Sequence, residues 1–246
     1  MGHRNPARGI PSDSQVASRA PIFPLENLAK CDLDQPPFTS FFGAGTTVYI
    51  KGPPWSRSMV TERLLPPGQR EVRKWPRLDL GIVPRFDPKD WDLRVDGSVE
   101  KPLRFTYDEF LRLPSARVMS AFHCVTGWTT FDNEWVGTTI RELADRAQIR
   151  PSARFATFRC GDGYTTSHPL TVLYDSDVLL TFQWDGKPLP IEHGGPVRLL
   201  VPKRYAYKSA KWVRSVTFTD EEELGYWEVR GYSNTADPVT EDRYSF

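Results

Sequence analysis

The chain has 246 residues, of which 39% are hydrophobic and 13% aromatic, a composition that supports a packed core and excludes wholesale disorder. Its formal net charge of +1 excludes a global electrostatic field that would favour nucleic acid or an anionic membrane. The 22 prolines and 17 glycines indicate a loop-rich, strand-rich fold rather than a helix bundle.

The three cysteines, Cys31, Cys124 and Cys160, form neither a disulfide framework nor a Cys-x-x-Cys metal pair. Their low, odd number favours a reducing compartment. The first 22 residues hold no apolar signal segment and no twin-arginine pair. No stretch approaches the roughly 18 apolar residues of a membrane span. We therefore expect a soluble, cytoplasmic protein without a membrane span.

Two regions are expected along the chain. Residues 1–62 are rich in Pro, Ser, Arg and Asn and predict a largely irregular N-terminal extension, with one short strand at Val48–Ile50. The turn cluster Leu64–Gln69 marks the boundary. Residues 63–246 are expected to form the compact domain.

Two short helices are predicted in this domain. Thr106 and Glu109 have the spacing of a capping box that opens the first helix. Thr139 and Glu142 repeat that spacing before a second helix of about 10 residues. One face of this helix is apolar, and it comprises Ile140, Leu143, Ala144 and Ala147.

Strands outnumber helices. The first predicted strand is Trp91–Val95, followed by a hairpin turn at Asp96–Gly97, and Asp185–Gly186 predicts a second turn. Further apolar runs predict strands at Arg117–Phe122, Phe155–Cys160, Val178–Trp184, Val197–Val201 and Lys211–Phe218. Strands and helices do not alternate regularly, so the predicted class is α+β and β-rich.

The stretch Ser120–Trp128 places a cysteine at the end of an apolar run, directly before a Thr-Gly-Trp turn. A residue where a strand ends and a loop begins is often functional. Cys124 could be a small buried hydrophobe, a nucleophile or a soft metal ligand. His123 is an unsuitable partner for a nucleophile because adjacent strand residues point to opposite faces. His168 or His193 would have to serve instead.

The stretch His193–Arg214 contains six basic residues and no acidic one. A solvated basic strand edge is one explanation. A phosphate seat is another, with Arg198 as a clamp and the backbone amides of Gly194 and Gly195 helping. Nucleic acid could use the same charges, but the near-neutral net charge argues against it. Arg159–Tyr164 contains two glycines around an acid, which predicts a tight turn rather than a dinucleotide fingerprint.

Three motifs occur together: Phe122–Trp128, Gly161–Thr166 and Gly195–Val213. This combination resembles the sulfite oxidase-like molybdopterin-dependent oxidoreductases. It is most similar to the small bacterial branch that includes the catalytic subunit of protein-methionine-sulfoxide reductase. The resemblance covers about residues 63–246 and implies a fold of β-rich, mixed, barrel-like sheets with short helices, the sulfite oxidase-type molybdopterin-binding fold.

The resemblance implies that Cys124 binds molybdenum, whose other sulfur ligands come from molybdopterin. It also implies a set of cofactor-binding positions, namely Arg85, His123, Cys160, His193, Arg198, Ser209, Ala210 and Lys211. Among these, His123 is expected to play a supporting part. Arg159 is expected to lie near the reacting side of the metal as a catalytic cation that attracts an anionic substrate.

The implied activity is oxygen-atom transfer on a small sulfur or nitrogen oxo-compound, either sulfite oxidation or reduction of a sulfoxide or N-oxide. Because the chain has no haem domain, a separate electron-transfer partner is expected. No nucleic-acid partner is expected. Two alternatives stay open: a non-catalytic, β-rich anion- or nucleotide-binding module without the metal, and a thiol hydrolase that uses Cys124.

Overall fold

The computed structural model describes residues 65–245. The predicted N-terminal extension, with its strand at Val48–Ile50, lies outside these residues, and the boundary at residues 62 and 63 stays a prediction. No helix among the described residues is both long and apolar enough to cross a bilayer.

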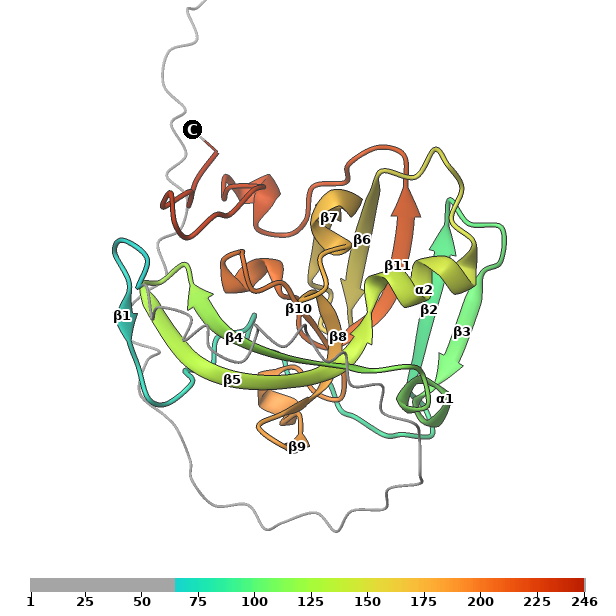
Figure 1. Ribbon diagram of the computed structural model, residues 1–246, viewed down its shortest axis with the longest axis horizontal. Helices are drawn as coiled ribbons and strands as arrows, with labels where there is room; N and C mark the ends of the chain where they lie inside the picture. The colour runs from blue at the N-terminus through green and yellow to red at the C-terminus, as the bar shows by residue number, and fades with distance from the viewer. Residues whose placement is uncertain (1–64, 246) are drawn as a thin grey trace, which may run out of the picture. The chain divides into compact units, whose positions relative to one another are not determined.

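The first of two mixed sheets, sheet A, has six strands and carries the cysteine turn (Figure 1). Its strands are β1 (Arg70–Glu71), β4 (Ala116–Cys124), β5 (Trp128–Thr139), β8 (Leu179–Trp184), β9 (Lys187–Pro188) and β10 (Arg198–Leu200). The long, curved β5 pairs with β1, β4 and β8, and β8 in turn pairs with β9 and β10. Only the β1–β5 pair in this sheet is parallel.

Sheet B has five strands in the order β3-β2-β11-β6-β7. They are β2 (Asp92–Gly97), β3 (Leu103–Thr106), β6 (Phe155–Cys160), β7 (Thr165–Pro169) and β11 (Val213–Thr219). The central strand β11 pairs with β2 in parallel and with β6 antiparallel. Sheet B therefore joins segments from both ends of the described chain.

The helices are short; the two predicted ones begin where expected, and a third has no counterpart among the predictions. They are α1 (Tyr107–Leu111), α2 (Ile140–Ala147) and α3 (Leu170–Leu173), with 3₁₀ turns η3 (Ile191–His193), η4 (Ala206–Lys208) and η5 (Glu228–Arg230). Thr106 and Glu109 form the predicted capping box, and the Thr139 side chain accepts a hydrogen bond from the Glu142 amide. A cap of this kind contributes about 1 kcal/mol.

Two buried clusters form the core. The larger one contains the apolar face of α2, whose four predicted residues are all buried, packed with residues of β2, β6 and β11. The smaller one is aromatic and lies on sheet A, where Trp75 contacts Phe122 and Trp135 edge-on, with ring centroids 5.2 and 5.4 Å apart. Burial of large rings such as these is a major favourable term in folding.

The α+β, β-rich prediction is confirmed, and so are the six predicted strands within a few residues of their ends. Asp185 and Gly186 form the predicted two-residue turn, with φ of 48° and 74° and Trp184 paired with Lys187 across it. The hairpin after β2 has a longer loop than predicted, because Val95 pairs with Leu103. Five strands, β1, β3, β5, β7 and β9, have no counterpart among the predictions.

Candidate functional site

Cys124 is the last residue of β4 and lies at the start of a tight turn. The Gly127 amide donates to the Cys124 carbonyl at 3.0 Å, and Gly127 has φ of +91°, which favours glycine. The Cys124 residue is 5% exposed, and its Sγ lies 3.2 Å from Oγ1 of Thr126. The thiol is therefore buried at the edge of sheet A, beside an exposed hydroxyl.

The electrostatics around Cys124 act in two directions. Burial raises the pKa of the Cys124 thiol, while Thr126 and the positive charges of Arg243 and Lys211 oppose that rise. A thiol in this setting stays protonated at neutral pH unless a metal ion replaces its proton. Among residues 65–245, no three His, Cys, Asp or Glu side chains converge to hold a metal ion.

Arg198 is a buried cation whose guanidinium, among the described residues, donates to carbonyl oxygens and lies over the rings of Trp75 and Phe122. It is 2% exposed, and it donates to the carbonyls of His193 at 2.7 Å and Ser209 at 2.8 Å. No carboxylate within 4.0 Å pairs with it in the part of the chain that the structure describes. Burial lowers the pKa of Arg198 to about 9, so it keeps its charge at neutral pH. An unpaired buried charge is costly, and an anion bound here would offset that cost.

Lys211 adds a second cation beside Arg198. Its Nζ donates to the Glu192 carbonyl at 3.0 Å and lies 3.6 Å from Oδ2 of Asp79. Desolvation and then repulsion by Arg198 lower the pKa of Lys211 to about 8. Two cations held this close repel each other, which also favours an anion between them.

Gly194 brings backbone close to both cations. It has φ of +106°, and a Cβ built on it would lie 3.0 Å from Cβ of Lys211 and 3.1 Å from Cβ of Arg198. No larger residue fits without displacing them. The Gly194 and Gly195 amides donate to the carbonyls of Ile191 and Pro190, both at 3.0 Å, so the predicted help from these amides is corrected. The character of a phosphate seat rests on the two cations.

His193 packs against the aromatic cluster. Its ring stacks on Trp75 with centroids 4.2 Å apart and an 8° angle between planes. Burial, followed by the charges of Arg198 and Lys211, lowers the pKa of His193 to about 4. His193 is therefore neutral at pH 7, and its ring can form a hydrogen bond to a bound group without adding charge.

Cys160, at the end of β6, faces the same group. Burial is the main cause of its strongly raised thiol pKa, and the nearby charge of Arg198 opposes that rise. Asp162, two residues on, also has a raised pKa because it is desolvated, while Lys211 acts to lower it. The predicted turn at residues 161–163 thus lies near Arg198 and Lys211, on a second side of the candidate site.

Ser209 and Ala210 hold the backbone of the phosphate seat in place through hydrogen bonds. The Ser209 hydroxyl accepts from the Val201 amide at 2.9 Å, and the Ala210 carbonyl accepts from the Leu199 amide at 2.8 Å. Both residues are buried at 2% exposure. They fix the spacing between Arg198 and Lys211.

His123 turns away from this group, as the strand alternation predicts. Its Nδ1 lies 2.9 Å from Oγ1 of Thr129, which in turn donates to Gln69. The Gln69 side chain also donates to the Cys124 carbonyl at 3.1 Å. His123 therefore supports the cysteine turn from behind.

Two predicted residues are not brought into the group. Arg159 is exposed and forms a bidentate ion pair with Glu223, both contacts at 2.8 Å. It follows from strand alternation that Arg159 and Cys160 point to opposite faces of β6, so the predicted role of Arg159 beside the metal is corrected. Arg85 is exposed and lines a surface pocket with Asp87, Asp90 and Arg214, although the preceding Pro84 packs near Gly161.

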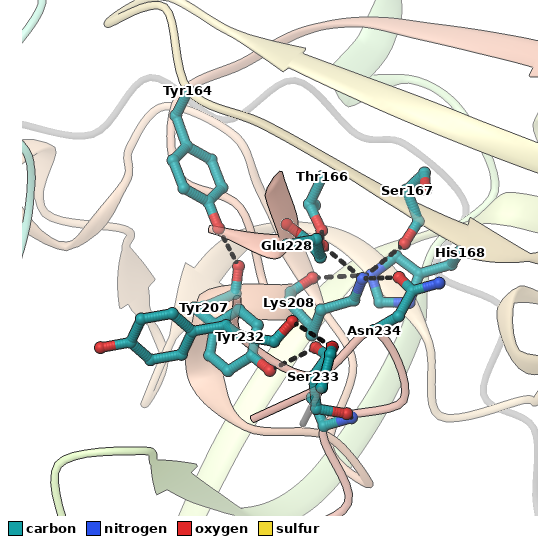
Figure 2. Close-up of polar contacts among 12 residues, drawn as sticks. Tyr164, Thr166, Ser167, His168, Tyr207, Lys208, Glu228, Tyr232, Ser233 and Asn234 are labelled. Carbon is teal, nitrogen blue, oxygen red and sulfur yellow. Dashed lines mark hydrogen bonds and ion pairs between the residues drawn. The ribbon is translucent and has the colours of Figure 1, made fainter. Parts of the chain in front are cut away.

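The segment that carries Ser209 and Lys211 is anchored by a pair that sequence reasoning missed (Figure 2). Lys208 and Glu228 form an ion pair in which each side chain is 1% exposed. Lys208 also donates to the Ser167 carbonyl at 2.8 Å, and Thr166 donates to Glu228 at 2.7 Å. This network ties η4 to β7 and to the C-terminal segment.

Other residues near the cysteine were also missed. The charge of Asp79 raises the pKa of Lys211 and that of Arg77 lowers it. Arg243 acts to lower the pKa of the Cys124 thiol, and Cys124 acts to raise the pKa of Tyr232. They come from the segment before β2 and from the C-terminal segment, so only the tertiary fold brings them together. The basic composition of the stretch 198–214 gave no signal for them.

The donor set fits a molybdopterin group. A buried thiol suits a soft metal ligand, and two cations at one buried glycine turn suit a phosphate. The Arg198 guanidinium lies over the ring of Phe122, two residues before Cys124, and Gly194 packs against both Arg198 and Lys211. The structure thus brings together a candidate metal ligand and a candidate phosphate site, the two parts that such a cofactor requires.

Comparisons with known proteins point the same way. A family model described as the oxidoreductase molybdopterin binding domain matches residues 80–227. The uncharacterized oxidoreductase YuiH of Bacillus subtilis is 34% identical over 183 residues, which is 74% of this chain and 92% of that protein. The catalytic subunit MsrP of protein-methionine-sulfoxide reductase from Ralstonia nicotianae is 29% identical over 187 residues.

The match with MsrP covers 64% of this chain but 54% of that protein, so the chain spans about half of this relative's length. Among solved structures, the sulfane dehydrogenase SoxCD from Paracoccus pantotrophus matches with a TM-score of 0.52 and 27% identity. That match covers 56% of this chain and 40% of the SoxCD chain. It confirms the predicted molybdopterin-binding fold, and the family match confirms an enzyme with a molybdopterin cofactor. The chain belongs to the oxidoreductase molybdopterin binding domain family.

Proposed function

We propose that the protein transfers an oxygen atom to or from a small sulfur or nitrogen oxo-compound, at a molybdenum–molybdopterin centre bound through Sγ of Cys124. One observation carries the proposal. The guanidinium carbon of buried Arg198 lies 4.9 Å from the centre of the Phe122 ring, on the strand that ends at the buried Cys124 thiol. A metal ligand and an anion seat are thereby held in one site.

Each side chain has a defined part in this proposal. Arg198 and Lys211 bind the cofactor's phosphate with charge-assisted hydrogen bonds, which contribute about 1.5–3 kcal/mol each. The backbone at Gly194, Ser209 and Ala210 fixes their spacing. His193, which is neutral, orients the pterin beside Trp75 without repelling the two cations.

When bound, the cofactor supplies two-electron oxygen-atom transfer, and the protein supplies its orientation and electrostatics. Cys124 gives up its Sγ proton on binding the metal. The charges of Arg243 and Lys211 favour the resulting thiolate. The turn at Val125–Gly127 and the hydrogen bond from Gln69 hold the cysteine backbone in place while the metal reacts.

A sulfur compound is supported by the named activities of two relatives, the methionine-sulfoxide reductase subunit and the sulfane dehydrogenase. MsrP and YedZ1, a relative from Azospira oryzae, are both named as subunits of a larger enzyme. This supports a separate electron-transfer partner for the present protein. A cytoplasmic location stays a prediction, which cell fractionation can test.

The decisive experiment is metal and activity analysis of protein purified from a host able to make molybdopterin. We expect about one molybdenum per chain, and oxygen transfer with sulfite or with a sulfoxide when an artificial electron carrier is supplied. Protein that carries no molybdenum from such a host would contradict the proposal and favour a non-catalytic anion-binding module. Molybdenum-loaded protein inactive on every sulfur and nitrogen oxo-compound tested would contradict the substrate class alone.

A further inference from the structure

Arg243 reaches from the C-terminal segment to the cysteine turn, 118 residues away in sequence. Its Nη1 donates a hydrogen bond to the carbonyl of Val125, the residue that follows Cys124. The Arg243 side chain is 20% exposed. It is therefore a mostly buried cation that holds the backbone next to the proposed metal ligand.

The surroundings of Arg243 are built to hold it. Its guanidinium lies 5.2 Å from the centre of the Tyr205 ring, a distance that favours a cation–π interaction. Gly68 has φ of +65°, and a Cβ there would lie 2.9 Å from Nη2 of Arg243 and 2.3 Å from Oε1 of Glu241. Gly68 thus leaves the space that the guanidinium and its carboxylate partner occupy.

The backbone around Arg243 is fixed as well. The Ser233 amide donates to the Arg243 carbonyl at 3.0 Å, and the Ser233 hydroxyl donates to Asp242 at 2.6 Å. Tyr207 donates to the Ser233 carbonyl at 2.5 Å, and Lys208 donates to the side chain of Asn234 (Figure 2). The segment that carries Arg243 is therefore tied to the same stretch that forms the phosphate seat.

The charge of Arg243 is only partly balanced. Among residues 65–245, its carboxylate partner is Glu241, with Nη2 and Oε1 3.3 Å apart, and the Glu241 side chain is 46% exposed. An exposed carboxylate is screened by water, so it offsets the buried cation weakly. A net positive charge therefore remains beside the sulfur of Cys124.

We propose that Arg243 is a positioning residue that fixes the Val125–Gly127 turn and places a positive charge beside the metal ligand, which raises the reduction potential of the bound metal. The inference rests on the proposed function, because it takes Cys124 as that ligand. A fixed positive charge stabilises the more electron-rich, reduced state by Coulomb attraction. Groups that surround a metal's ligands commonly tune the metal in this way.

The test compares two variants whose charges change in opposite senses. Arg243→Gln removes the cation, and we expect the midpoint potential of the metal to fall. Glu241→Gln removes the opposing anion while keeping a hydrogen-bond acceptor, and we expect the potential to rise. Arg243→Lys keeps the charge and should return the potential most of the way to the wild-type value. The readout is a redox titration followed by the electron paramagnetic resonance signal of Mo(V).

Arg230→Gln is the matched control, because Arg230 is an exposed arginine of the same segment that lies over the Tyr226 ring. It should leave the potential and the resonance signal unchanged. Equal potentials in wild type, Arg243→Gln and Glu241→Gln would overturn the inference, as would a shift of both variants in one direction. Should Arg243→Gln fail to fold, the rise expected in Glu241→Gln decides the matter alone. Wild-type protein without molybdenum would instead refute the proposed function.

Discussion

Lys208 and Glu228 face each other in the interior, and each side chain of this ion pair is 1% exposed. Burial lowers the pKa of Lys208, and the carboxylate of Glu228 opposes that shift. Oε2 of Glu228 has no hydrogen-bond partner among the described residues, whereas its Oε1 accepts from both Lys208 and Thr166. The pair is consequently sensitive to the loss of either charge.

Removing one member of this pair should be much worse than removing both. We expect Lys208→Met to lower the free energy of unfolding by about 3–5 kcal/mol, because it leaves a buried carboxylate unpaired. Urea unfolding of the cofactor-free protein measures this. The double variant Lys208→Met with Glu228→Gln should recover a large part of the loss. Additive effects of the two substitutions would show that the ion pair is not the source of the sensitivity.

Cys124→Ser should abolish oxygen transfer and alter the metal's electronic signature, because a serine oxygen is a harder ligand than a thiolate. The fold should persist, since the substitution changes one atom. Activity assays and X-ray absorption at the molybdenum edge measure the two effects. Met119→Ser is the control, because Met119 lies on the same strand and is 60% exposed. Full activity in Cys124→Ser would rule out the ligand assignment.

Arg198→Ala and Arg159→Ala should differ sharply in cofactor retention. Arg198→Ala removes the buried cation of the phosphate seat, and loss of about 1.5–3 kcal/mol corresponds to roughly 10- to 150-fold weaker binding. Arg159→Ala breaks only a surface ion pair with Glu223 and should retain molybdenum. Molybdenum content after extended dialysis measures retention. Equal loss from both variants would contradict the placement of the phosphate seat at Arg198.

The cofactor-free protein should become more stable as the pH rises from about 8 toward 10.5, because the buried Lys211 loses its charge in the folded state. The pKa of Lys211 is about 8 in the fold and 10.5 ordinarily, so the unfolded chain binds more protons in this window and the free energy of unfolding increases with pH. Below pH 8 the full penalty of the buried cation remains. Chemical unfolding of the cofactor-free protein across this pH range measures the effect.

Lys211→Met should remove this pH dependence and stabilise the cofactor-free protein at pH 7 by on the order of 1–3 kcal/mol. The same variant should hold the cofactor less well, which separates stability from binding. Lys203→Met is the control, because Lys203 is 60% exposed and pairs with Asp175 at the surface. Retention of the pH dependence in Lys211→Met would show that another group causes it.

The sequence predicted α2 well because its information is local. The hydroxyl of Thr139 caps the helix, and Leu143 with its neighbours repeats at helical spacing, so both signals lie within one turn or two. Strand β5 was missed because its alternation fails. Asp132 within it has φ of 57°, and the polar residues Thr129, Thr130 and Asn133 are buried, so neither polarity nor period marks the strand.

Within the site, the turn at Cys124 was predictable because a contiguous motif carries it, while the phosphate seat at Arg198 and Lys211 stays a prediction. Arg159 was misplaced because the sequence does not show which face of β6 a residue occupies, and its partner Glu223 lies 64 residues away. Arg243 was missed for a related reason. Its hydrogen bond to Val125 exists only once the C-terminal segment has folded back onto the cysteine turn.

The strand order of sheet B has a consequence for when the cofactor can enter. Strand β11 lies in the centre of this sheet, although it is the last strand in the chain. On the ribosome, β2 with β3 and β6 with β7 cannot join until Thr219 has emerged. Arg198 and Lys211 are synthesised earlier, but sheet B is still incomplete at that stage. Molybdopterin is therefore expected to be inserted after Thr219 has emerged, into a domain that has already closed its sheet.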